Sequence, residues 1–194
     1  MIDLGESVIA VGRDGRLSGP DLLEALTRGL LSTGIDVIDL GMVATPMVYF
    51  AANQTINGQK PKSGIMITGS HNPPNYNGFK MVLGGAAIYG EKIQGLYQQI
   101  QNKSFKQGQG QRSQFDIFPM YLQRIVSDVH LTRPMKITID CGNGVGGAFA
   151  TQLFRALGCE VEELFCEVDG NFPNHHPDPA HLENLQDLIQ NLAQ

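Results

Sequence analysis

A serine and a histidine stand side by side in a loop that follows a short apolar run. Gly64–Thr68 (GIMIT) is typical of a buried strand, and Ser70 and His71 come shortly after it. A serine hydroxyl becomes a useful nucleophile when a neighbouring group takes its proton or stabilises the charge of the product. His71 could transfer that proton, and Lys80 could present a positive charge to phosphoryl oxygens. The pattern predicts a reactive hydroxyl at the end of a strand.

The residues between Thr68 and Lys80 favour a stiff loop. Gly69 permits a sharp turn, and Pro73 and Pro74 restrict the backbone after it. Such a loop leaves its amide groups free for an anion. The alternative is a purely structural turn, which is the more common meaning of an adjacent serine and histidine.

Strand and helix signals alternate around this loop. Apolar runs predict strands at residues 7–11 and 36–40, and Ser18 is expected to cap the helix between them. This rhythm predicts parallel strands joined by helical crossovers, whose carboxyl ends, including that before Ser70, are where open α/β sheets bind ligands. Further strands are expected at 79–83, 136–140 and 159–164, and helices at 45–53, 91–101, 118–129, 148–157 and 181–192.

A polar segment divides the chain. Residues 103–114 (KSFKQGQGQRSQ) carry few apolar side chains and two glycines, which predicts a linker. We therefore expect a first domain over residues 1–115 and a second, incomplete one over residues 116–194. The expected fold class is α/β, with mixed, largely parallel sheets flanked by helices.

Composition excludes several classes of protein. A net charge of -5 over 194 residues disfavours a nucleic-acid binder. No apolar run approaches the roughly 20 residues of a membrane span, and no basic segment opens the chain as in a secretory signal. Cys141, Cys159 and Cys166 lack zinc-site spacing and indicate reduced thiols. We expect a cytoplasmic protein without a membrane or nucleic-acid partner.

The thirteen residues from Thr68 to Lys80 (TGSHNPPNYNGFK) resemble the active-site loop of the α-D-phosphohexomutases. In that family the pattern T-[AG]-S-H-N-P, followed by N-G-x-K, surrounds a serine that carries a phosphoryl group. The form here is most similar to the bacterial phosphomannomutase/phosphoglucomutase branch. Other stretches resemble the same family, and these are residues 11–19 (VGRDGRLSG), 41–46 (GMVATP), 140–147 (DCGNGVGG) and 167–179 (EVDGNFPNHHPDP).

The resemblance implies a phosphohexomutase. Such an enzyme interconverts hexose 1-phosphate and hexose 6-phosphate, of mannose or glucose, through a phosphoserine and a hexose bisphosphate intermediate. Ser70 would be the phosphoryl carrier, His71 the proton-transfer partner and Lys80 the cation that steadies the transferring group. A phosphoglucomutase-like first domain is the fold expected around them.

Three further residues receive roles from the resemblance. Asn72 would help to orient the loop. Arg13 and Arg16 are candidates for contact with a phosphate, and a local salt bridge with Asp14 is an equally weighted alternative.

The resemblance also implies Mg²⁺. In the family a phosphoserine oxygen and three aspartates of a D-x-D-G-D-R loop bind the ion, so Ser70 would contribute through its phosphoryl group. Neither that string nor the family's opening Y-D-x-R-G segment occurs in this sequence. We therefore expect a fragment with little or no mutase turnover by itself, from an enzyme that is monomeric when intact.

A glycine motif in the second half supports a different function. Gly142–Gly147 (GNGVGG) matches G-x-G-x-x-G after an expected strand, and Glu162 lies where a ribose-binding acid would be. A dinucleotide-binding protein is therefore the main alternative, although Asp140 would place a carboxylate at the pyrophosphate.

Three histidines and an aspartate gather near the end of the sequence. His175, His176, Asp178 and His181 are of types that bind zinc or iron. Neighbouring side chains of an extended segment point to opposite sides, however, so a connecting loop is the expected role. A non-catalytic remnant of the enzyme is the last interpretation that the sequence leaves open.

Overall fold

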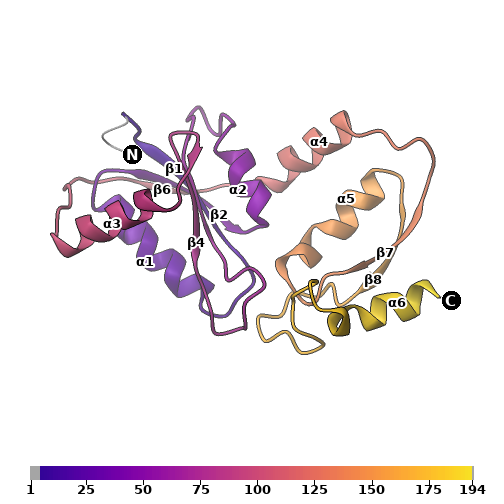
Figure 1. Cartoon of the computed structure of the whole chain (residues 1–194). Coiled ribbons are helices and arrows are strands. Elements are labelled where there is room, and N and C mark those ends of the chain that lie inside the picture. The colour runs from indigo at the N-terminus through magenta and orange to yellow at the C-terminus, as the bar shows by residue number, and fades with distance from the viewer. Residues whose placement is uncertain (1–4, 194) are drawn as a thin grey trace.

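The computed structural model describes residues 5–193, so the first four residues of the expected first domain lie outside it. Six strands form one sheet in the order β5-β4-β3-β1-β2-β6, and β7 and β8 form a second sheet (Figure 1). The strands are β1 Val8–Arg13, β2 Asp36–Met42, β3 Gly64–Ile67, β4 Phe79–Leu83, β5 Ala86–Ala87, β6 Arg112–Gln114, β7 Lys136–Asp140 and β8 Glu160–Leu164. The helices are α1 Gly19–Leu31, α2 Thr45–Ala51, α3 Glu91–Gln101, α4 Phe118–Asp128, the 3-10 helix η2 Val145–Ala148, α5 Ala150–Ala156, the 3-10 helix η3 Leu182–Leu185 and α6 Gln186–Leu192.

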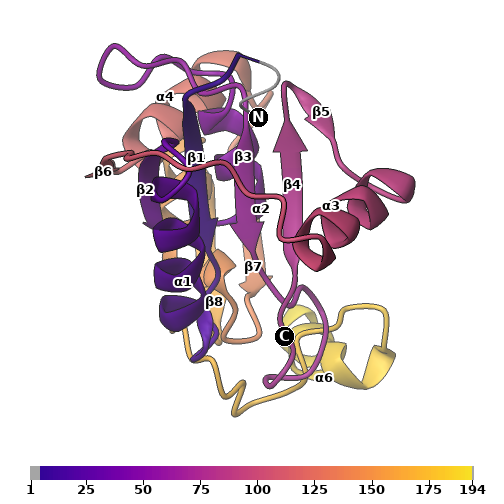
Figure 2. The same cartoon turned by 90° about the vertical axis from the view of Figure 1, so that its left-hand side faces the viewer.

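Strand β1 lies in the middle of the large sheet, between β2 and β3. It pairs in parallel with both neighbours, and β3 pairs antiparallel with β4, so the expected mixed, largely parallel α/β sheet is confirmed. The chain moves from β1 to β2 through α1 and crosses back to β3 through α2. The carboxyl ends of β1 and β3 therefore meet where the strand order reverses, the usual ligand position in an open α/β sheet. Figure 2 shows β1, β3 and β4 side by side, with α3 beyond β4.

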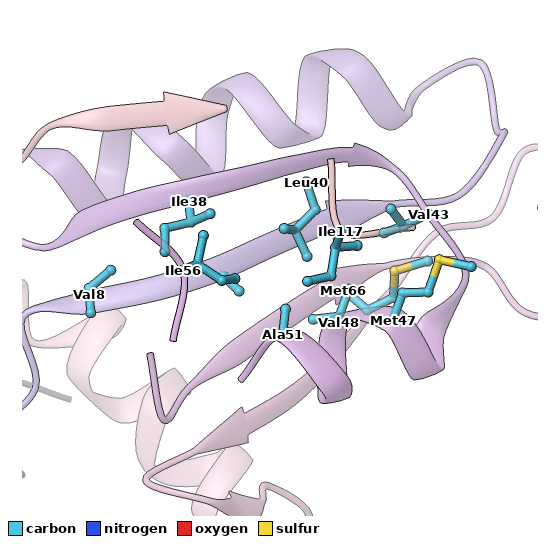
Figure 3. Close-up of a cluster of buried hydrophobic side chains, with 11 residues drawn as sticks. Val8, Ile38, Leu40, Val43, Met47, Val48, Ala51, Ile56, Met66 and Ile117 are labelled. Atoms are coloured by element: carbon cyan, nitrogen blue, oxygen red, sulfur yellow. The ribbon is translucent and has the colours of Figure 1, made fainter. Parts of the chain in front are cut away.

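Both faces of the central strands are buried, which explains their continuous apolar runs. Alternate residues of β1 face opposite sides of the sheet. Ala10 packs with α2 and Ile117, whereas Ile9 and Val11 pack in the cluster that contains Leu23 of α1. Figure 3 shows side chains of the first cluster, which come from three strands, α2 and three connections.

Part of the expected linker is a strand. Arg112–Gln114 form β6, which pairs in parallel with β2 at the edge of the sheet. The pairing relies on backbone hydrogen bonds and on the Arg112 guanidinium, which bonds Asp39 at 2.7 Å and Glu24 at 2.7 Å. A strand held in this way needs no apolar side chains, so the composition of the segment did not indicate it.

Helix α4 joins the two sheets (Figure 1). Tyr121 of α4 meets Phe50 of α2 at a ring-centroid distance of 5.4 Å, and Phe118 meets Phe149 of the second half at 5.0 Å. These aromatic contacts pack α4 against both halves of the chain. Among residues 5–193, no helix combines the length and the apolar character that a membrane crossing requires.

Candidate active site

Ser70 stands three residues beyond the end of β3, in the loop that leads to β4. Its backbone has a φ of 53°, in the left-handed region that a serine rarely adopts, and its amide donates to Thr68 Oγ1 at 2.9 Å. A non-glycine residue in this region carries a local energy cost and is held there by its surroundings. The residue is exposed and lines a cavity of about 330 Å³ together with His71 and Lys80. The three residues predicted from the loop pattern are therefore brought together.

Arg16 holds the loop from beneath. This side chain is 1% exposed, and each of its five N–H groups has an acceptor. Nε donates to Asp14 Oδ2 at 3.2 Å. The four remaining N–H groups donate to carbonyl oxygens of the serine loop, which belong to Ser70, Asn72, Pro73 and Tyr76. All of these donors are therefore bonded to acceptors within the chain. This matches the salt bridge with Asp14, which was one of the two alternatives that the sequence left open for Arg16.

Asp14 completes this support. Its Oδ1 accepts the Arg16 amide at 3.0 Å, and its Oδ2 accepts both Arg16 Nε and the Gly69 amide at 3.2 Å. The ion pair is buried, with side-chain exposures of 1% for Arg16 and 10% for Asp14. One carboxylate at the end of β1 therefore fixes both the arginine and the start of the serine loop.

Gly69 is required by the path of the arginine. A Cβ at this position would lie 2.2 Å from Arg16 Cζ, far inside van der Waals contact. The flexibility of glycine explains part of its presence here, but the close passage of the guanidinium is the stronger constraint.

His71 is oriented by the second half of the chain. Its Nδ1 lies 2.8 Å from the carbonyl oxygen of Pro177. Because a carbonyl only accepts hydrogen bonds, this contact requires the proton on Nδ1 and leaves Nε2 of the neutral ring as an acceptor. In Figure 1 the segment before α6 lies beside the loop between β3 and β4. This contact orients the exposed ring and leaves Nε2 outside it.

Lys80 and Asn72 occupy different parts of this arrangement. Lys80, on β4, is exposed and lines the cavity, and across the described part of the chain its ammonium group has no hydrogen bond or ion pair. Asn72 Nδ2 donates to Gly69 O at 2.8 Å, and the Asn72 amide donates to the same oxygen at 3.0 Å. Asn72 therefore closes the turn, whereas Lys80 presents an unneutralised charge.

Two residues before α1 differ from their expected contacts. Arg13 Nη1 donates to Asp14 O at 3.0 Å, and Arg13 is not among the residues that line the cavity. Ser18 precedes α1 as expected, but its side chain makes no capping hydrogen bond. Its Oγ instead accepts from Asn77 Nδ2 at 2.5 Å, which ties the start of α1 to the serine loop.

Sequence reasoning missed the contacts that the second half makes with this loop. The Phe172 ring centroid lies 5.2 Å from Arg16 Cζ, a cation–π distance. A Cβ on Gly15 would lie 2.3 Å from Val168 Cγ1, so the loop after β1 packs directly against this segment. Residues 167–179 carry a family resemblance, but no local pattern indicated that they would cover Arg16 and reach His71.

The glycine motif of the second half is packed by the chain itself at Gly142 and Gly147, whereas Gly144 and Gly146 line the cavity that contains Ser70. Asp140 accepts the Gly142 amide at 2.8 Å and pairs with His175 Nε2 at 3.0 Å. A Cβ on Gly147 would lie 1.9 Å from Cys166 O, and Glu162 accepts Asn191 Nδ2 at 2.5 Å. These groups face protein atoms, so the dinucleotide interpretation is not supported.

His175 pairs with Asp140 in a partly buried contact between a basic side chain and an aspartate. Burial lowers the pKa of its imidazole, but the His176 carbonyl and the Asp140 carboxylate raise it by more, so the net pKa is above 6.5. His181 Nε2 lies 3.6 Å from Asp178 Oδ2 and makes a separate contact. The histidines of this segment therefore do not converge on one point, and the zinc or iron hypothesis gains no support.

Oxygen donors near Ser70 do not make a magnesium site by themselves. Asp14 lines the cavity, but both of its oxygens already accept hydrogen bonds. Over residues 5–193, no group of three or more His, Cys, Asp or Glu side chains is placed to hold a metal ion. Since Mg²⁺ requires near-octahedral oxygen ligands, these residues do not fit the ion on their own.

Two family descriptions match almost the whole chain. "Phosphoglucomutase/phosphomannomutase, alpha/beta/alpha domain I" matches residues 3–107, and domain II of the same family matches residues 119–194.

Curated relatives share more than half of the aligned residues. The chain is 55% identical over 185 residues to a phosphomannomutase/phosphoglucomutase of Pseudomonas aeruginosa and 58% identical over 187 residues to a phosphoglucomutase of Neisseria gonorrhoeae. Each match covers 95% of this chain. It spans 39% of the Pseudomonas protein and 40% of the Neisseria protein.

Solved structures agree with the fold. A phosphoglucomutase/phosphomannomutase family protein of Burkholderia thailandensis superimposes with a TM-score of 0.96 at 57% identity, covering 98% of this chain and 43% of that one. A phosphomannomutase-like structure from Thermus thermophilus has a TM-score of 0.76 at 24% identity, covering 98% of this chain and 44% of that one, and so bears on the fold alone.

Proposed function

Because the chain belongs to the phosphoglucomutase/phosphomannomutase family, we propose that it is the serine-bearing part of a phosphohexomutase. The reaction interconverts hexose 1-phosphate and hexose 6-phosphate, of glucose or mannose. The Pseudomonas and Neisseria relatives are a phosphomannomutase/phosphoglucomutase and a phosphoglucomutase, which supports this substrate class. The observation that carries the proposal is the exposed Ser70 hydroxyl, which shares a cavity of about 330 Å³ with His71 and the unpaired Lys80.

Ser70 is the proposed phosphoryl carrier. The phosphorylated serine transfers its PO₃ group to a free hydroxyl of the hexose monophosphate, giving a hexose bisphosphate. The bisphosphate then reorients and returns its other phosphoryl group to Ser70. The P–O bond to the serine breaks as the bond to the sugar forms, and the return step reverses this with the other phosphate.

His71 and Lys80 have distinct roles in this transfer. His71 Nε2 takes the proton of the attacking hydroxyl and returns it to the departing oxygen, because its Nδ1 is already committed to Pro177 O. Lys80 stabilises the negative charge on the transferring phosphoryl oxygens. A proton acceptor and an unneutralised cation on one cavity wall suit a reaction that depends mainly on positioning and charge.

Asn72 and the two arginines receive supporting roles. Asn72 keeps the loop closed through Gly69 O, and Arg16 keeps the loop backbone in the strained conformation that exposes Ser70. Arg13 lies next to this support through Asp14 O, and we retain contact with a substrate phosphate as its proposed role.

Magnesium is the metal that the family resemblance implies. When bound it would neutralise charge on the phosphoryl oxygens, and this chain would contribute a phosphoserine oxygen of Ser70. The carboxylates of a D-x-D-G-D-R loop are absent from the sequence. We therefore propose that the 194 residues alone have little or no mutase turnover.

We also propose a domain boundary near residue 115, with residues 1–115 and 116–194 as the first and second domains. The two family matches end and begin on either side of it, at residues 107 and 119. The proposed partners are a phosphorylated hexose and a hexose bisphosphate, bound by a monomer in the cytoplasm.

Transfer of a labelled phosphoryl group tests the proposal. The chain is incubated with ³²P-labelled glucose 1,6-bisphosphate and Mg²⁺, and protein-bound label is measured after removal of the sugar. We expect label on the unaltered chain and on Ser127→Ala, a control on the exposed surface of α4, and none on Ser70→Ala. Equal labelling of Ser70→Ala and the unaltered chain would contradict the proposed role of Ser70.

A further inference from the structure

Two cysteines from neighbouring strands meet beside the Ser70 cavity. Cys141 follows β7 directly, and Cys166 lies two residues beyond the end of β8. Their sulfur atoms are 3.2 Å apart, and both residues are free thiols. Since a disulfide bond is about 2.05 Å long, the sulfurs need to approach by about 1 Å, which side-chain rotation can supply.

Each thiol lies at the wall of a different cavity. Cys141 lines the cavity that also contains Ser70 and His71. Cys166 lines a separate cavity of about 620 Å³ beside α5, whose wall also includes Gln152 and Glu167. Both sulfurs are therefore half-buried, yet small molecules can approach the pair from two sides.

The backbone on each side of the pair is held in place. The Cys141 amide donates to Leu164 O at 3.0 Å, and the Gly144 amide donates to Cys141 O at 2.7 Å. Gly147 approaches Cys166 O so closely that it admits no side chain. The two thiols are thus kept as neighbours by the fold, unlike Cys159, which precedes β8 at its opposite end.

The surroundings of Cys141 disfavour its thiolate form. Burial raises the pKa of the Cys141 thiol to about 12, and the hydrogen bond from Cys166 and the nearby charges act in the same direction. Since the thiolate is the nucleophile, Cys141 is a poor first target for an oxidant. Whichever sulfur is oxidised first, the other lies 3.2 Å away and can resolve the product.

We propose that Cys141 and Cys166 are a redox modification site, which a peroxide converts into an intramolecular disulfide. One of the two sulfurs attacks one oxygen of hydrogen peroxide, the O–O bond breaks, and a sulfenic acid and one water form. The other sulfur then attacks the sulfenic sulfur, the S–O bond breaks, and a second water leaves. Two thiols lose two protons and two electrons, and one peroxide becomes two waters.

The disulfide links the turn after β7 to the end of β8. Because Cys141 belongs to the wall of the Ser70 cavity, oxidation changes the chemical lining of that cavity from a thiol to a disulfide. This thiol chemistry goes beyond the proposed mutase function and does not depend on it.

The test treats the complete chain with graded hydrogen peroxide and then alkylates the remaining thiols. We expect a loss of about 2 Da and of two of the three alkylatable thiols, both reversed by a reductant. Trypsin leaves Cys159 and Cys166 on one peptide, so a second protease must cut after Glu160, Glu162 or Glu163. The non-reduced digest should then contain a peptide pair that links Cys141 to Cys166.

Matched variants sharpen this result. Cys159→Ser should form the same disulfide as the unaltered chain, whereas Cys141→Ser and Cys166→Ser should not lose the 2 Da. Oxidation in denaturing urea should also produce pairs with Cys159, because the fold no longer selects the partner. The peptide map of the unaltered folded chain is decisive even where a variant does not fold. Linkage to Cys159, linkage between chains, or a Cys141 that stays fully alkylatable while Cys166 is oxidised would overturn the proposal.

Discussion

One aspartate in each sheet lies at or directly after the end of a strand, and the two show how similar hydrogen bonds produce different sites. Asp14 follows β1 and accepts the amide of Arg16, and Asp140 ends β7 and accepts the amide of Gly142. Each carboxylate also meets a basic side chain, Arg16 in the first case and His175 in the second. The two turns therefore begin with the same hydrogen-bonding pattern.

The residues after each aspartate make the two regions different. Arg16 reaches into the next loop, binds four of its carbonyls and leaves the Ser70 side chain exposed to a cavity. The glycine turn after Asp140 is instead packed by His175 and by Cys166 O. The turn after Asp140 is structural at Gly142 and Gly147, where its own chain packs against it, and Gly144 and Gly146 line the Ser70 cavity from the other side.

Removal of the arginine should have the largest effect. Arg16→Met leaves the buried Asp14 carboxylate without its charged partner and removes one hydrogen bond from each of four loop carbonyls, so it should cost about 3–5 kcal/mol of unfolding free energy. Arg13→Met is the control, since Arg13 makes one hydrogen bond and is only half-buried, and it should cost less than about 1.5 kcal/mol. Urea unfolding measures both. Equal losses would show that Arg16 is not a special support of the serine loop.

Gly146 and Gly147 are neighbours in the turn after Asp140 and can be compared directly. Gly147→Ala places a Cβ 1.9 Å from Cys166 O and should destabilise the chain by about 1–3 kcal/mol. Gly146→Ala meets no atom within 4 Å and should change the unfolding free energy by less than about 0.5 kcal/mol. Thermal unfolding of the two variants is the measurement. If Gly147→Ala were as stable as Gly146→Ala, the turn would not be filled by its own chain.

The contributions of Arg16 and His175 to the unfolding free energy should depend differently on pH. The pKa of His175 in the folded state is above its ordinary value of 6.5. Its contribution is therefore fully present below pH 6.5 and is lost as the pH rises through the folded-state pKa. The unfolding free energy of the unaltered chain relative to His175→Gln should fall by the order of 1 kcal/mol between about pH 5.5 and about pH 9. A constant difference would contradict the charged His175–Asp140 pair.

The last prediction, with the smallest expected effect, is that the turn at residues 142–147 does not bind a nucleotide. Titration of NADH with the chain should leave the nicotinamide fluorescence unchanged, because the turn's polar groups face protein atoms. A saturable change that Gly146→Ala removes would restore the dinucleotide interpretation of residues 142–147.

Local patterns predicted most elements and the candidate site residues that the structure brings together. The apolar runs of β1, β2 and β3 mark strands buried on both faces, and the Gly, Asn and Pro pattern placed Ser70, His71 and Lys80 around one loop. Their shared cavity arises from a strand order that brings the ends of β1 and β3 together.

Long-range contacts account for the features that sequence reasoning missed. Arg16 binds carbonyls 54–60 positions away, and His71 meets Pro177 O across 106 positions, so no local pattern reports either contact. Strand β6 was missed because backbone pairing and Arg112 hold it, not apolar side chains. Glycine spacing alone suggested a dinucleotide site. The spacing carries no information about which protein atoms pack against the turn, so it could not exclude that hypothesis.

The phosphorylation state of Ser70 tests the central claim most directly. Trypsin releases Ser70 on the peptide of residues 63–80, and fragmentation distinguishes it from Ser63, Thr68 and Tyr76 on the same peptide. The peptide from the chain isolated from cells, or treated with hexose bisphosphate, should gain about 80 Da at Ser70. A phosphate confined to any other residue of that peptide would contradict the role of Ser70 as the phosphoryl carrier.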